Sequence, residues 1–164
     1  MVVLENVPRL LTLDNGAVHR HVSRSLATLG YLVHYRILNS AEYGAPQSRK
    51  RLFYVAVRPG HAFRWPEPVP SDKRRVLEDA LEPEPKFIAR TPTLTCWTPI
   101  RVWQDRGRVR ITRPREMARL QGVPDALPVP ASEQAANSLF GNMVCVDVVQ
   151  GVFESLVFFR EKKI

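Results

Sequence analysis

The sequence predicts an α/β fold in which a strand, a helix and two further strands precede an irregular proline-rich region and C-terminal helices. Residues 1–7, MVVLENV, form an apolar run typical of a buried strand, and the run ends before Pro8. An apolar stripe at helical spacing follows, made of Val18, Val22, Leu26 and Leu29. Residues 51–58, RLFYVAVR, are apolar, aromatic and β-branched, as strands are. These three patterns favour a sheet with a helix packed on it.

Boundary residues support this order of elements. Asp14 or Asn15 is expected to cap the first helix, and Gly30 is placed to end it. Residues 31–38 read as the second strand, and a loop containing glycine and proline separates it from the third.

The second half of the chain has a different texture. From residue 59 to about 99, prolines are too dense for long regular elements, except for a short helix near 76–81. Two further helices are predicted, over 112–120 and over 144–159.

The charge balance favours a polyanionic partner. Lys and Arg number 24 against 16 Asp and Glu, which gives a net charge of +8. A solvated basic surface would explain the same composition. No stretch approaches the roughly 20 apolar residues of a membrane span and no signal core is present, so a cytoplasmic location is expected. The two cysteines, Cys96 and Cys145, predict neither a disulfide framework nor a metal site.

Four segments carry a family resemblance by their order and composition. They are LENVPRLL at 4–11, GAPQSRKRLFYVAVR at 44–58, RPREMARLQGVPD at 113–125 and NSLFGNMVCVDVV at 137–149. Together they resemble the later motifs of the DNA cytosine-C5 methyltransferases, and FRWPEPVPSDKRRVLEDAL at 63–81 resembles the link between two of them.

The resemblance implies a fold and a division of the chain. The fold would be the C-terminal part of a Rossmann-like methyltransferase fold that uses S-adenosyl-L-methionine. Residues 1–58 would form core strands, 59–111 a proline-rich link with a short target-recognition region, and 112–164 helical motifs that return to the core.

The resemblance also assigns residues to a flipped cytosine. Glu5 would assist at N3 of the base, with Asn6 at the same site and the rigid step into Pro8 fixing its geometry. Arg51 would contact the O2 side, while Arg49 and Gln47 would order the pocket; all three alternate, so an extended segment would place them on one side. A strand-terminal carboxylate at an ordinary loop, and a charged edge strand, are the structural alternatives.

Further arginines are expected to contact DNA. The recognition region offers Arg101, Arg106, Arg108 and Arg110, interleaved with Trp97 and Trp103. Arg115 and Arg119 lie four apart and share a helical face, which would contact phosphate or simply be solvated.

The last two motifs carry one departure and one cofactor contact. Arg113 stands where the family often has a threonine cap, so a shift of the cap to Thr112 is expected. In the last motif, Asn142 of a Gly-Asn turn would contact S-adenosyl-L-methionine.

Two elements of that family are missing from this sequence. No cysteine follows a proline, because Cys96 follows Thr95 and Cys145 follows Val144, and no Gly-X-Gly pair occurs. We therefore expect an incomplete chain or subunit, inactive alone, that acts on double-stranded DNA with a partner carrying the catalytic cysteine and cofactor turn. Its first strand would be an open edge. A non-catalytic DNA-binding remnant and an RNA cytosine methyltransferase fragment remain the alternatives.

Overall fold

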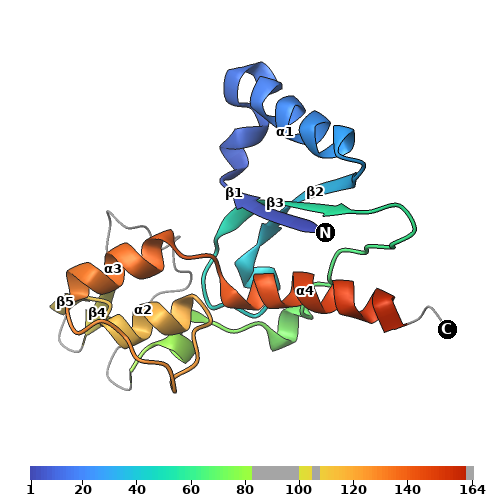
Figure 1. Cartoon of the computed structure of the whole chain (residues 1–164). Coiled ribbons are helices and arrows are strands. Elements are labelled where there is room, and N and C mark those ends of the chain that lie inside the picture. The colour runs from blue at the N-terminus through green and yellow to red at the C-terminus, as the bar shows by residue number, and fades with distance from the viewer. Residues whose placement is uncertain (83–99, 105–107, 162–164) are drawn as a thin grey trace. The chain divides into compact units, whose positions relative to one another are not determined.

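The computed structural model describes residues 1–82, 100–104 and 108–161 of the chain (Figure 1). The chain forms two compact units. The first comprises Met1–Asn39, Lys50–Pro66 and Gly151–Ile164, and the second comprises Ser40–Arg49 and Glu67–Gln150.

The first unit is built on a three-stranded antiparallel sheet. Strands β1 (Val2–Asn6), β2 (Leu32–Asn39) and β3 (Lys50–Val57) lie in the order β1-β3-β2. Helix α1 (Ala17–Thr28) connects β1 to β2, which confirms the expected order of strand, helix, strand and strand. Within the described residues β1 pairs with β3 alone, so β1 is an edge strand, as expected.

The central strand β3 carries the core of this sheet. Its residues from Leu52 to Val57 are all buried, because β3 has a strand on each side and side chains against both faces. On one face His19 of α1 lies 2.8 Å, Nδ1 to hydroxyl oxygen, from Tyr54. On the other, the Arg36 guanidinium lies 5.6 Å from the centre of the Trp65 ring.

Helix α1 begins differently from the expectation. Its N-cap is Gly16, with φ of 79°, and no side chain caps it, so the prediction of Asp14 or Asn15 was wrong. Both of those residues have left-handed backbone in the tight turn before the helix, with φ of 50° and 48°. The predicted stop is confirmed, since Gly30 has φ of 81° and donates its N–H to the Ala27 carbonyl.

The second unit has helices around a two-stranded sheet. Strands β4 (Arg101–Gln104) and β5 (Arg108–Ile111) pair antiparallel and are followed by α2 (Pro114–Leu120) and α3 (Glu133–Asn142). One buried cluster joins these elements to the short 3-10 helix Leu77–Ala80, which falls within the helix expected near 76–81. The cluster consists of Leu77, Ala80, Ile100, Val102, Met117, Ala118, Leu120, Ala136 and Phe140.

The last helix, α4 (Val146–Glu161), begins in the second unit and continues into the first. Residues 133–156 have the length and hydropathy of a membrane span, contrary to the expectation from sequence. They are not one helix, because α3 ends at Asn142 and Met143 is extended, with ψ of 150°. Length and composition are therefore weak evidence for a span.

Candidate active site

Glu5 and Arg51 form an ion pair on the sheet of the first unit. Glu5 lies opposite Phe53 in the β1–β3 register, and Arg51 is two residues away from Phe53 along β3, so the two side chains are diagonal neighbours on one face. Arg51 Nε lies 3.0 Å from Glu5 Oε1. The side chains are 19% and 24% exposed, respectively, which leaves both within reach of a ligand. A carboxyl group beside a guanidinium offers hydrogen-bond acceptors and donors to a planar polar molecule.

The turn after Glu5 is fixed locally. The Asn6 Oδ1 accepts a hydrogen bond of 2.8 Å from the Val7 N–H, and Pro8 opens a 3-10 turn directly afterwards. The step that holds Glu5 at the strand end is therefore ordered, as the sequence predicted. A contact of Asn6 with substrate stays a prediction.

Gln47 and Arg49 are buried in the second unit, where they act as a clamp on backbone carbonyls. Gln47 Nε2 donates to the Leu120 carbonyl at 2.7 Å, and Arg49 Nη2 donates to the Gly141 and Met143 carbonyls at 3.0 Å each. Their exposed fractions are 2% and 3%. We call these two residues the Gln47–Arg49 clamp.

The clamp changes one expectation about geometry. Strand β3 begins only at Lys50, and Gln47 lies in a bend, so residues 47–51 are not the single extended segment that was expected. Ser40 stabilises the bend, because its Oγ donates to the Gln47 carbonyl at 2.8 Å and its N–H donates to the Arg49 carbonyl at 3.0 Å. The direct roles of Gln47 and Arg49 toward a substrate stay predictions.

Asn142 is the exposed last residue of α3, and it lies between the two carbonyls that Arg49 holds. Arg49 therefore orders the backbone on both sides of the residue predicted to meet the cofactor. The chain has no Gly-X-Gly turn to add to it. One exposed side chain does not fit S-adenosyl-L-methionine as a complete site, so this chain supplies part of a wall at most.

The arginines of the recognition region differ in their surroundings. Arg101 is exposed on β4 and Arg108 lies on β5, while Arg106 and Trp97 fall outside the described residues. Arg110 instead forms a two-pronged ion pair with Glu116, at 2.7 and 2.6 Å. Its side chain is 14% exposed, so this arginine is held by the protein itself.

Helix α2 keeps its start at Pro114, with Arg113 at the N-cap position, so the expected shift to Thr112 was wrong. The reason is Glu116, whose carboxylate accepts the Arg113 N–H at 2.7 Å and replaces a threonine cap. Further along α2, Arg119 forms a two-pronged pair with Asp125, at 2.8 Å for both bonds. This pair raises the pKa of Arg119 and lowers the pKa of Asp125.

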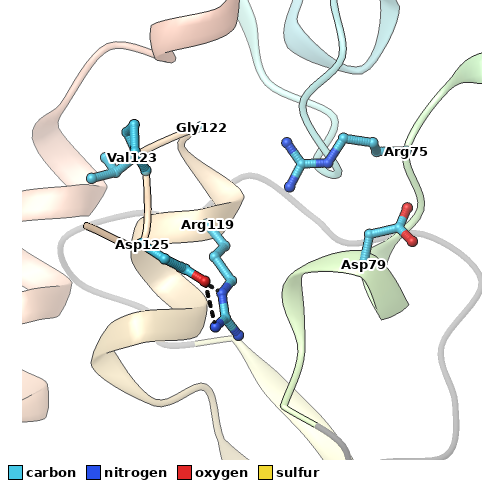
Figure 2. A pocket seen from close by; sticks show the side chains of 7 residues that line it. Arg75, Asp79, Arg119, Gly122, Val123 and Asp125 are labelled. Carbon is cyan, nitrogen blue, oxygen red and sulfur yellow. Dashed lines mark hydrogen bonds and ion pairs between the residues drawn. The ribbon is translucent and has the colours of Figure 1, made fainter. Parts of the chain in front are cut away.

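A pocket of about 250 Å³ lies beside that pair in the second unit. Figure 2 shows the Arg119–Asp125 pair and the Arg75 guanidinium approaching from another side. The pocket is lined by Arg75, Asp79, Arg119, Gly122, Val123, Pro124 and Asp125. Two arginines face two aspartates, so the lining charges balance and do not select a polyanion. No motif in the sequence drew attention to Arg75 or Asp79.

Two acidic or thiol groups near the start of α4 are perturbed by burial. Burial raises the pKa of the Cys145 thiol to about 11, which suits an inert buried thiol rather than a nucleophile. Burial also raises the pKa of Asp147, although the charge of Arg75 opposes the shift. The Asp147 carboxylate packs against Gly122, where an added Cβ would lie 2.8 Å from its Cγ.

Comparison with known proteins agrees with these motifs. The family of C-5 cytosine-specific DNA methylases matches residues 1–99 and 86–157, so the chain belongs to this family. Type II methyltransferase M.NgoBI of Neisseria gonorrhoeae is 30% identical over 183 residues, covering 90% of this chain and 58% of the relative. M.HaeII of Haemophilus aegyptius is 28% identical over 191 residues, covering 94% and 60%. The chain thus spans about 60% of the length of these relatives.

Solved structures show the same fold. The chain superposes on Dnmt2 methyltransferase of S. pombe with a TM-score of 0.72 at 18% identity, covering 98% of this chain and 65% of that one. The methyltransferase EhMeth of Entamoeba histolytica gives 0.70 at 16% identity, covering 99% and 63%. The fold is therefore part of the Rossmann-like methyltransferase fold, and the family uses S-adenosyl-L-methionine as its cofactor.

Proposed function

We propose that this chain is the part of a DNA cytosine-C5 methyltransferase that contacts the target cytosine and the DNA. A partner would carry the catalytic cysteine and most of the cofactor site. The observation that carries the proposal is the Glu5–Arg51 pair at 3.0 Å, formed by the two residues that the family motifs place at the base.

The pair has the chemistry that attack on cytosine needs. Carbon C6 of cytosine is a poor electrophile until the ring can accommodate negative charge, so a carboxyl group hydrogen-bonded at N3 assists addition there. A guanidinium can donate to O2 of the same ring. Because Arg51 Nε already holds Glu5, the two groups would meet one ring edge together.

The missing elements point to a second polypeptide or segment. The sequence has no Pro-Cys pair and no Gly-X-Gly turn, which the reaction and the cofactor require in this family. Strand β1 has one unpaired side among the described residues, and it exposes Leu4 by 40%, with Val7 exposed by 48% just beyond it. Such an edge favours pairing with another strand. The chain alone is expected to self-associate, which light scattering would detect.

Arginines of the β4–β5 hairpin would bind the DNA backbone. Arg101 is exposed on β4, and Arg106 and Arg108 lie nearby in the sequence. Replacing these three by alanine should flatten the dependence of log affinity on log salt, by about 0.9 for each phosphate that the variant no longer neutralises. Fluorescence anisotropy with duplex DNA measures this slope. An unchanged slope in the triple variant would remove the hairpin from the DNA surface.

The catalytic role is tested in a complex reconstituted with an amino-terminal methyltransferase half. Glu5→Gln should lower labelled-methyl transfer to DNA by about 10² to 10⁴, the usual contribution of a general acid. Glu78→Gln, at an exposed acid of the other unit, is the matched control and should leave the rate unchanged. Full activity of the Glu5→Gln complex would exclude Glu5. DNA binding without methylation by any complex would instead favour the non-catalytic remnant.

A further inference from the structure

Glu116 is a completely buried carboxylate with four hydrogen-bond donors around it. Oε1 accepts from Arg110 Nη2 at 2.6 Å and from the Glu82 N–H at 2.9 Å. Oε2 accepts from Arg110 Nη1 at 2.7 Å and from the Arg113 N–H at 2.7 Å. Its exposed fraction is 0%, so each oxygen depends on these partners in place of water.

Capping of α2 explains only one of these bonds. The Arg113 N–H is the donor that a glutamate at the third helical position ordinarily accepts. The other three bonds go outside the helix, to Arg110 on β5 and to the backbone of Glu82. Glu82 and Arg110 stand on the two sides of the recognition segment in the sequence, so one carboxylate holds both of its ends.

A second contact joins the same two ends. Arg113 Nη1 forms an ion pair with Glu82, but its side chain is 44% exposed and that of Glu82 is 32% exposed. An exposed pair contributes little, whereas a buried pair that loses one partner leaves a costly charge behind. Glu116 is therefore the dominant link.

We propose that Glu116 is a positioning residue for DNA recognition, which fixes the β4–β5 hairpin on α2 so that the arginines of the hairpin meet the DNA backbone in a set geometry. The inference rests on the proposed function for its DNA-contacting step. The anchoring step depends only on the contacts within the second unit.

The test compares ion pairs on one helix. Glu116→Gln keeps the size of the side chain but cannot accept four donors, because one of its terminal atoms becomes an NH2 group. Asp125→Asn is the matched control, since it weakens the pair with Arg119 on the same helix without touching the hairpin. Arg110→Lys provides a second variant if Glu116→Gln fails to fold, because it keeps the charge and removes the two-pronged geometry.

Two readouts on the full chain separate positioning from general stability. Amide hydrogen exchange in β4 and β5 should become at least about tenfold faster in Glu116→Gln, while exchange in β1 to β3 and in α3 should not change. Affinity for duplex DNA should fall by about fivefold or more and the salt slope should become shallower. Asp125→Asn should change neither readout.

Each outcome decides one step. Equally faster exchange throughout the chain, or unchanged exchange in the hairpin, would overturn the anchoring role. A loosened hairpin with unchanged DNA affinity and slope would overturn the positioning role. Absence of DNA binding by the unmodified chain would count against the proposed function, while the exchange data would still judge the anchor.

Discussion

Replacing Arg49 by methionine tests whether the Gln47–Arg49 clamp is structural, since methionine fills a similar volume without donors. Arg49 is 3% exposed and donates to the Gly141 and Met143 carbonyls. Each buried carbonyl left unsatisfied costs about 1–3 kcal/mol. The two carbonyls therefore predict a loss of about 2–5 kcal/mol in the free energy of unfolding.

Urea unfolding followed by circular dichroism measures this loss. For a slope of about 1–3 kcal/mol per molar urea, the midpoint should fall by roughly 1–3 M. Arg51→Met is the matched control, because its pair with Glu5 is partly exposed and should be worth less than about 1 kcal/mol. If Arg49→Met unfolds at the same urea concentration as Arg51→Met, the clamp does not stabilise the fold as argued.

Two other substitutions test local features of the second unit. Gly122→Ala should destabilise the fold more than Gly30→Ala: both glycines have positive φ, near 76° and 81°, but only at Gly122 would the new Cβ meet a side chain, that of Asp147. Thermal unfolding of both variants compares the two, and an equal loss would remove the role of the Asp147 contact. Asp147→Asn should raise the urea midpoint at pH 7, because burial raises the pKa of Asp147 and so its charged form is disfavoured in the folded state. The gain should shrink as the pH falls through the raised pKa and Asp147 becomes protonated, and a gain that does not depend on pH would contradict this explanation.

Patterns that follow local rules predicted the first unit well. The apolar run before Pro8 and the β-branched run in β3 are both strands of one sheet, and β3 is buried at its centre. The cap of α1 was missed since Asp14 and Asn15 adopt left-handed backbone, which takes their side chains out of capping geometry. Tertiary context, not propensity, decided that turn.

The second unit was predicted less completely. The β4–β5 hairpin was expected to be irregular, although RVWQ and RVRI alternate as strands do. Helix α3 was not predicted, yet Ser132 accepts the Ala135 N–H, the usual signal of a helix start. Both signals were present in the sequence and were outweighed by the density of prolines nearby.

The candidate site shows where sequence reasoning ends. The family motifs brought Glu5 and Arg51 to one base, and their ion pair forms as diagonal neighbours in the register. The partners of Arg49 and Glu116 could not be predicted, because they are backbone groups or residues distant in the sequence. Long-range pairing of this kind depends on packing that no local pattern encodes.

Methyl transfer to DNA by a reconstituted complex tests the central claim most directly. The chain and an amino-terminal half carrying the Pro-Cys loop and the glycine-rich turn are purified separately and mixed with duplex DNA and labelled S-adenosyl-L-methionine. We predict label on cytosine C5 with the mixture and none with either component alone. Label transferred by this chain alone, or no label from a mixture that assembles and binds DNA, would contradict the account.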